Sequence, residues 1–209
     1  MQNNYDKAKG VRMFDIKKET IVLTSNDKSK ADILEKEGFR CFCFSSLFQE
    51  YKVLANPFIT GHDFALKYSD KRAMDVGNLY PDFYVVSVVQ TIECDGKVLK
   101  HPNCVEDVMN DFRTLNGKKF TVYTATTIRK NFKKRWQDIK STTLTRIYMT
   151  EQQIHDFVYY KLGTSTFGVL GSVRLDEHPE MVKEKNIDPL VINGFPAEDI
   201  IHFFKTLKE

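Results

Sequence analysis

The sequence predicts an α/β protein in which strands and helices alternate along one chain of 209 residues. Two observations lead to this class. Residues 83–127 show the pattern strand, hairpin, helix and strand. A β-branched run at 84–89 predicts the first strand, and the pair Asp95-Gly96 predicts the hairpin turn. Apolar residues at helical spacing in 105–115 predict the helix, and alternating apolar and polar residues in 119–128 predict the second strand. In the flanking segments, short apolar strands also alternate with amphipathic helices.

Composition and charge are those of a globular domain, with 42% hydrophobic and 28% charged residues and no apolar run long enough to span a bilayer. The net charge of +3 is too small to indicate nucleic-acid binding by itself. The first ten residues lack the apolar core of a secretory signal, so a cytoplasmic location is expected. We expect residues 1–18 to form an N-terminal extension that is disordered at its start, and residues 19–209 to form a single domain.

The N-terminal elements create a candidate anion site. Thr20–Leu23 is a short apolar strand, followed by a polar turn and then a helix with Ile33 and Leu34 on its inner face and Gly38 at its end. Free backbone N–H groups and the helix dipole point at such a turn. Lys28 and Lys30 add positive charge that suits a triphosphate, although lysines at a solvated helix start show the same pattern. Residues 39–44 alternate as a second strand.

The cysteines favour buried structural thiols over a metal site or disulfides. Cys41 and Cys43 face the same way on the second strand. A zinc site would need further Cys or His residues at ligand spacing, and none is present near these two cysteines or near Cys94 and Cys104. Residues 60–63 then start a helix that carries Phe64, Ala65, Tyr68, Arg72, Ala73 and Val76.

In the central stretch, Asn103 is the expected N-cap of the helix and Asn116-Gly117 its end. Residues 129–140 follow as a basic segment that contains Phe132 and Trp136. Such a segment is typical of a solvated hairpin tip, and the alternative is RNA binding through phosphate contacts and stacking at Arg129–Trp136.

Residues 141–149 alternate as a strand, and Thr150 with Gln153 predicts a capping box for the next helix. We expect Leu190–Asn193 to be a short strand. Pro196 marks the first turn of a final helix, which packs through Ile200, Ile201, Phe204 and Leu207.

The central stretch resembles the Maf family of nucleotide pyrophosphatases. That family carries a strand ending in Asp-Thr, a Gly-containing hairpin, Lys-Pro, a helix, Leu-Ser-Gly, and a strand ending near Tyr-Thr. The matching residues are Gln90-Thr91, Gly96, His101-Pro102, Leu115-Asn116-Gly117 and Tyr123-Thr124. The resemblance extends from about residue 20 to residue 207. It implies a central mixed, twisted sheet flanked by helices, with two lobes around a cleft as in the related inosine triphosphatase group, and it suggests a homodimer.

The resemblance also implies a set of site residues. Ser25 falls on the family's serine, Lys28 and Lys30 fall near its arginines, and Arg72 aligns with a lysine that faces the phosphates. Glu50 is the best-placed carboxylate for the family's metal ligand. The family's catalytic aspartate and lysine are replaced by Gln90 and His101, and Leu170 stands in place of a glutamine.

Maf enzymes cleave a nucleoside triphosphate between the α and β phosphates. They need Mg²⁺ or Mn²⁺, cations for the developing charge, and an activated water. Gln90 offers no charge and cannot accept a proton, and a histidine in place of the lysine is not a permanent cation. Losing a general base costs about 10² to 10⁴ in rate.

Three hypotheses follow from the sequence. The first is a pyrophosphatase with weak or altered activity, using Mg²⁺ or Mn²⁺. The second is a catalytically inactive relative that binds a nucleotide or a partner and needs no cofactor. The third is an RNA- or ribosome-associated factor.

Overall fold

A computed structural model describes residues 20–56, 58–162 and 170–207. A six-stranded mixed sheet has the order β2-β1-β3-β5-β6, and β4 pairs with β3. β1 runs parallel to β2 and β3, and the other pairs are antiparallel. The strands are β1 (Thr20–Leu23), β2 (Arg40–Cys43), β3 (Tyr84–Cys94), β4 (Lys97–Val98), β5 (Lys119–Lys130) and β6 (Lys133–Thr145). The predicted class is therefore confirmed, and the expected extension at residues 1–18 lies outside the described residues.

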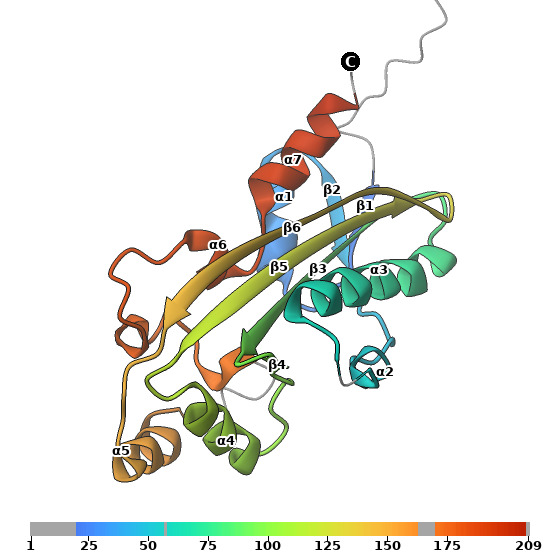
Figure 1. The fold of residues 1–209 in the computed structure, drawn as a ribbon. Helices are drawn as coiled ribbons and strands as arrows, with labels where there is room; N and C mark the ends of the chain where they lie inside the picture. Colours follow the sequence, from blue (N-terminus) through green and yellow to red (C-terminus); the bar gives the residue numbers. More distant parts are fainter. Residues whose placement is uncertain (1–19, 57, 163–169, 208–209) are drawn as a thin grey trace, which may run out of the picture.

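Helices flank this sheet along its length (Figure 1). Residues 157–162 continue the fifth helix with π-helical hydrogen bonds, and short 3₁₀ turns occur at 170–172 and 179–181. No helix in the described ranges is long and apolar enough to cross a membrane. The α-helices are α1 (Lys28–Lys36), α2 (Tyr51–Leu54), α3 (Gly61–Leu79), α4 (Val105–Leu115), α5 (Glu151–Asp156), α6 (Pro189–Asn193) and α7 (Ala197–Thr206).

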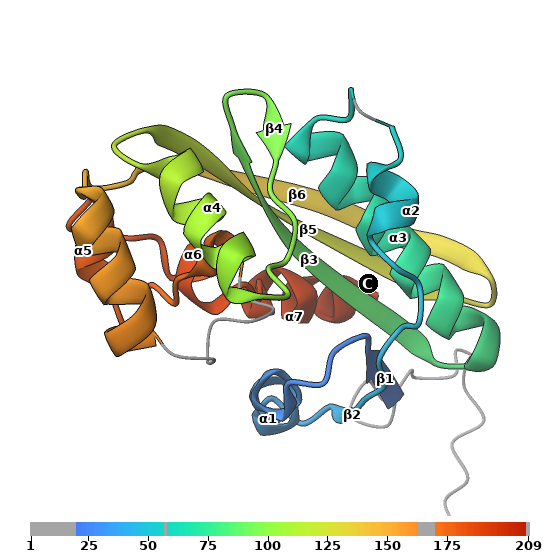
Figure 2. The ribbon, with the colours of Figure 1, turned by 90° about the horizontal axis from the view of Figure 1, so that it is seen from below.

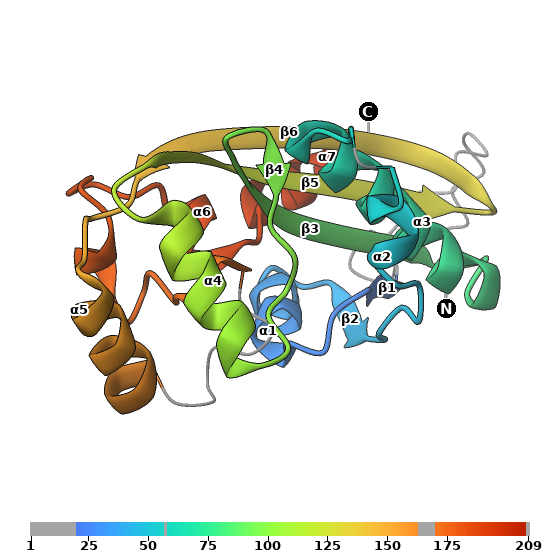
Figure 3. The ribbon, with the colours of Figure 1, turned by 60° about the horizontal axis from the view of Figure 1, so that its bottom comes forward.

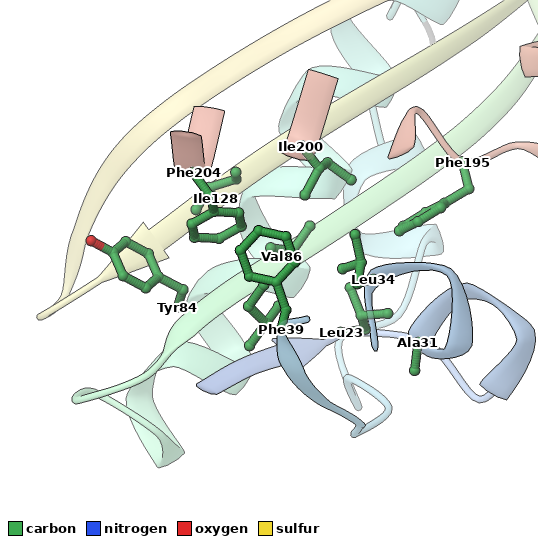
Figure 4. Close-up of a cluster of buried hydrophobic side chains, with 11 residues drawn as sticks. Leu23, Ala31, Leu34, Phe39, Tyr84, Val86, Ile128, Phe195, Ile200 and Phe204 are labelled. Atoms are coloured by element: carbon green, nitrogen blue, oxygen red, sulfur yellow. The ribbon is translucent and has the colours of Figure 1, made fainter. Parts of the chain in front are cut away.

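The alternation of side chains along β3 assigns helices to the two faces of the sheet. Val86 packs in a cluster with Leu34 of α1 and with Ile200 and Phe204 of α7 (Figure 4). Its neighbour Val85 points the other way and packs against α3 in a separate cluster. α1 and α7 therefore cover one face at this end of the sheet, and α3 covers the opposite face.

The other end of the molecule forms a second lobe around α4, α5 and the segment 157–162 (Figure 2). Its core includes Phe112 of α4 and Phe157, whose ring centroids lie 5.6 Å apart. The predicted capping box at the start of α5 is confirmed. The Thr150 side chain accepts from the Gln153 backbone N–H, and the Gln153 side chain accepts from the Thr150 N–H.

Several predicted details are wrong. Leu190–Asn193 is not a strand but part of α6, which Asp188 caps and Pro189 begins. The N-cap of α4 is Cys104 rather than Asn103. Ile33 is 38% exposed and Leu207 is 44% exposed, so neither is an inner-face residue.

The basic segment 129–140 contains a hairpin tip, as predicted, but most of it belongs to the strands β5 and β6 on either side of the tip. Asn131 and Phe132 both have positive φ, 52° and 60°, and form the turn between β5 and β6. β6 therefore begins at Lys133 instead of Ser141. Trp136 packs against Phe203 of α7, with ring centroids 5.8 Å apart, so the indole is engaged within the fold.

All four cysteines are unpaired thiols in this structure. Cys41 and Cys43 both pack against the cluster shared by α1 and α7, so they do face the same way. Cys94 is buried, whereas Cys104 is exposed at the start of α4, which differs from the expected burial.

Candidate active site

A cavity of about 1040 Å³ lies between the two lobes and is lined by residues from both. α1 and α4, which belong to different lobes, lie on the same side of β3 (Figure 3). The side chain of Leu170 and residues 163–169 fall outside the described part of the structure. Lys28 is exposed at the start of α1 and does not line the cavity. The predicted site residues that do line it are Ser25, Lys30, Glu50, Arg72, Gln90 and His101.

Lys30 and Arg72 supply positive charge on one side of this cleft. The Arg72 guanidinium donates to the backbone oxygen of Thr24 and lies 5.6 Å from the Tyr68 ring centroid. The nearest carboxylate oxygen to Lys30 is on Asp27, 3.9 Å from Nζ. Burial lowers the pKa of both groups, and repulsion from Arg72 further lowers the pKa of Lys30. Two half-buried cations with little compensating negative charge form a site for an anion.

The start of α1 differs from the predicted anion site. The Asp27 carboxylate accepts from the backbone N–H of Ser29 at 3.0 Å and from its hydroxyl at 2.6 Å. Ser25 in turn accepts from the Asp27 N–H at 3.1 Å. The hydrogen bond from the Ser29 hydroxyl is the main cause that lowers the pKa of Asp27. A carboxylate therefore already caps this helix, and the positive charge of the cleft comes mainly from side chains.

Glu50 and His101 form a closely bonded pair in the cleft. Nδ1 of His101 lies 2.6 Å from Oε2 of Glu50, and the His101 backbone N–H donates to Oε1 at 3.2 Å. Burial raises the pKa of Glu50, but the bonds from the His101 ring and backbone outweigh it and leave that pKa below its usual value. Both carboxylate oxygens of Glu50 are thus in use.

Gln90 lies within β3 rather than at its end, because the strand continues to Cys94. Its side chain shares the face of Val86 and crosses to α6. Nε2 donates to the backbone oxygens of Val191 at 3.1 Å and Leu190 at 3.4 Å, and lies 3.3 Å from the Thr124 hydroxyl. Gly194 ends α6 with φ of 57°, and a Cβ there would lie 3.3 Å from Oε1 of Gln90. The amide therefore ties the sheet to α6.

These residues do not fit the divalent cation that the resemblance implies. Mg²⁺ and Mn²⁺ prefer free carboxylate oxygens, whereas Glu50 is bonded to His101 and Gln90 is neutral. In the described ranges, no group of three or more His, Cys, Asp or Glu side chains is placed to hold a metal ion. We therefore derive no reaction step through such an ion.

Sequence reasoning missed other charged residues near the cleft. Arg174 lines it and bonds to Asp176 with distances of 2.6 and 3.3 Å. Deeper in the second lobe, Asp111 of α4 accepts from the Ser172 hydroxyl at 2.7 Å. Burial raises the pKa of Asp111 to about 6 and lowers the pKa of the nearby Arg146 to about 10. In the sequence, Asp111 stands among the apolar residues of α4, and this position is the signal that could have indicated a buried carboxylate.

The fold and site together define an α/β protein with a cation-bearing cleft between two lobes. A family model described as Maf-like protein matches residues 20–207, so the chain belongs to the Maf-like family of nucleoside triphosphate pyrophosphatases. The pyrophosphatases of this family are generally dependent on divalent metal ions.

Curated relatives and solved structures show distant similarity. A 7-methyl-GTP pyrophosphatase from Bartonella quintana is 20% identical and covers 85% of this chain and 90% of its own length. A dTTP/UTP pyrophosphatase from Akkermansia muciniphila is 23% identical over 87% of this chain and 93% of its own. The structure of a HAM1 protein from Coxiella burnetii aligns with 90% of this chain and 98% of its own, at 12% identity and a TM-score of 0.41.

Proposed function

We propose that this protein binds a nucleoside triphosphate in the cleft and releases pyrophosphate from it much more slowly than a family enzyme with an intact site. One observation carries the proposal. Six of the positions that match the family's site line one cavity, but Gln90 and Glu50 among them are bonded within the protein. The cleft thus keeps groups suited to binding and lacks groups suited to hydrolysis.

Lys30 and Arg72 are the proposed phosphate-binding residues, with Ser25 beside them and Lys28 at the rim. The polyphosphate is the only strongly anionic part of a nucleotide, and it matches the two half-buried cations. Hydrogen bonds between charged groups stabilise a complex by about 1.5–3 kcal/mol each. The nucleoside would extend toward the second lobe, where the cavity lining is mostly apolar.

Slow hydrolysis follows from the groups at positions 90 and 101. In-line attack of water on the α-phosphorus needs a group that accepts the water's proton, and an amide such as Gln90 cannot accept it. The loss of such a base lowers the rate by about 10² to 10⁴. The Nδ1 of His101 is committed to Glu50, so this ring does not replace the point charge of a lysine.

A nucleotide-binding protein without hydrolysis is the second candidate. The hydrogen bonds from Gln90 to α6 favour it, because they give the substituted position a structural role. Ribosome or RNA association through 129–136, a homodimer and a cytoplasmic location stay predictions.

Isothermal titration with α,β-methylene analogues of ATP, GTP, CTP and UTP tests the binding site. Arg72→Met and Lys30→Met should each weaken the tightest of these complexes by on the order of 10-fold. Arg113→Met is the matched control, because Arg113 is an exposed arginine of α4 paired with Glu106 and Glu151. The affinity of Lys28→Met for the same nucleotides decides whether Lys28 belongs to the binding site. Unchanged affinity in both the Arg72 and Lys30 variants would refute the proposed site.

A further inference from the structure

The carboxylates that line the cleft are all bonded to other groups of the protein. Glu50 accepts two bonds from His101, Asp27 accepts two from Ser29, and Asp176 is paired with Arg174. Among the described residues, these three are the acidic side chains of the cavity lining. Both bonds to Asp27 end on Oδ1, and its Oδ2 lies 3.9 Å from Nζ of Lys30. A cation entering the cleft would therefore have to displace a partner of Glu50 or Asp176, or approach Asp27 beside the positive charge of Lys30.

From this arrangement we infer that the cleft binds its phosphate ligand free of divalent metal, with Lys30 and Arg72 taking the place of the ion. The inference rests on the proposed nucleotide-binding function and specifies the form of the ligand. The ligand class is a nucleoside di- or triphosphate whose phosphate oxygens carry no Mg²⁺ or Mn²⁺.

Glu50 is the position at which a metal would be expected, and it is firmly engaged. Its side chain is 22% exposed and that of His101 is 35% exposed, so water competes only partly for their bonds. To become a metal ligand, the carboxylate would have to leave both the ring Nδ1 and the backbone N–H of His101. The backbone group has no other acceptor in the described structure, and an unmade buried hydrogen bond is costly.

Position 90 removes the second expected ligand. Nε2 of Gln90 points to the backbone oxygens of Leu190 and Val191, which fixes the amide orientation. Oε1 then faces the backbone at Gly194. The space there is small, because a Cβ added to Gly194 would lie 3.3 Å from this oxygen. A neutral oxygen in that position adds no charge for a hard cation, which binds carboxylates preferentially.

The cations of the cleft supply what the metal would otherwise supply. Within the described ranges, Arg72 has no carboxylate at ion-pair distance, and Lys30 has one only at 3.9 Å. Burial lowers the pKa of Lys30 and repulsion from Arg72 lowers it further, and a bound anion would relieve that repulsion. A Mg²⁺ ion on the phosphates cancels two ligand charges and so reduces the attraction to both side chains.

Titration of the same α,β-methylene nucleotides in EDTA and then in excess Mg²⁺ tests the inference. The expected affinity in EDTA is equal to or higher than that in Mg²⁺. Binding that is at least about 10-fold tighter with Mg²⁺ would overturn the inference and leave the proposed function standing. No binding under either condition would overturn both.

A second measurement uses Mn²⁺ alone and does not depend on the nucleotide. Wild-type protein should leave the electron paramagnetic resonance signal of free Mn²⁺ unchanged. The double variant Gln90→Asp/His101→Ala frees Oε2 of Glu50, which the His101 ring holds in the wild type, and adds a carboxylate at position 90, so it should reduce that signal. His62→Ala is the matched control, because it frees Asp63 at an exposed site away from the cleft. Stoichiometric Mn²⁺ binding by the wild type that is lost in Glu50→Gln would contradict the inference.

Discussion

Gln90 donates its amide protons to carbonyl oxygens of α6, and this contact could not be foreseen from the sequence. Gln90 and Val191 are 101 positions apart, and no local pattern links them. The same holds for Glu50 and His101, which are 51 positions apart. The sequence could indicate which residues gather near the cleft, because those positions follow the family's motifs. It could not indicate which of them bond to one another.

Gln90→Glu should destabilise the fold by about 1–3 kcal/mol, because a carboxylate of the same shape would face the backbone oxygens of Leu190 and Val191. Urea denaturation measures the free energy of unfolding. Gln152→Glu on α5 removes an exposed amide hydrogen bond to Asp156, and it should change the free energy of unfolding by less than about 0.5 kcal/mol because the site is solvated. Equal stability of Gln90→Glu and wild type would show that the bonds to α6 contribute nothing.

Asp111 should make stability fall with rising pH. Its pKa is about 6 in the fold against an ordinary value of 3.8, because burial disfavours the charged form. The protonated carboxyl therefore stabilises the fold below about pH 4, and this contribution is lost as pH rises through 6. The loss is on the order of 3 kcal/mol for a shift of about two units.

Asp111→Asn removes this titration and can still bond to Ser172. The free energy of unfolding, measured by urea denaturation at pH 4 and pH 7.5, should fall more in the wild type than in the variant. Parallel changes in the two proteins would exclude a raised pKa at Asp111.

At the scale of elements, strong local signals predict structure correctly and short apolar runs do not. The capping box of α5 and the turn at Asp95-Gly96 both appear as predicted. The strand predicted at Leu190–Asn193 is wrong because four residues of this kind cannot distinguish a strand from a buried helical turn. Asp188-Pro189 before it and Gly194 after it are helix start and stop signals, and they decide in favour of α6.

The β5–β6 hairpin tip should tolerate loss of its charge. Lys133, Lys134 and Arg135 are exposed, so replacing all three by Ser should change the free energy of unfolding by less than about 1 kcal/mol. The same variant tests the RNA hypothesis by filter binding at increasing salt. Salt-sensitive RNA binding by the wild type that disappears in the triple variant would support that hypothesis, and its absence in the wild type would reject it.

For the whole molecule, the mixed sheet places the two lobes so that motifs from distant segments face one cavity. β1 delivers Ser25 and α1, β3 delivers Gln90, and the loop before α4 delivers His101. The order of most elements was predictable because each has its own local pattern. The cleft itself depends on tertiary packing between lobes, and only the family resemblance pointed to it.

The central claim is that the cleft recognises a triphosphate but hydrolyses it slowly, and pyrophosphate release tests it most directly. Release should be measured over standard and modified triphosphates, with Mg²⁺ and with Mn²⁺, for the wild type and for Gln90→Asp/His101→Lys. We expect very slow release by the wild type. The double variant should show measurably faster, metal-dependent release, because both substituted charges are restored. Rapid wild-type turnover that Gln90→Asp reduces would contradict the account and would make Gln90 and His101 working parts of a different mechanism.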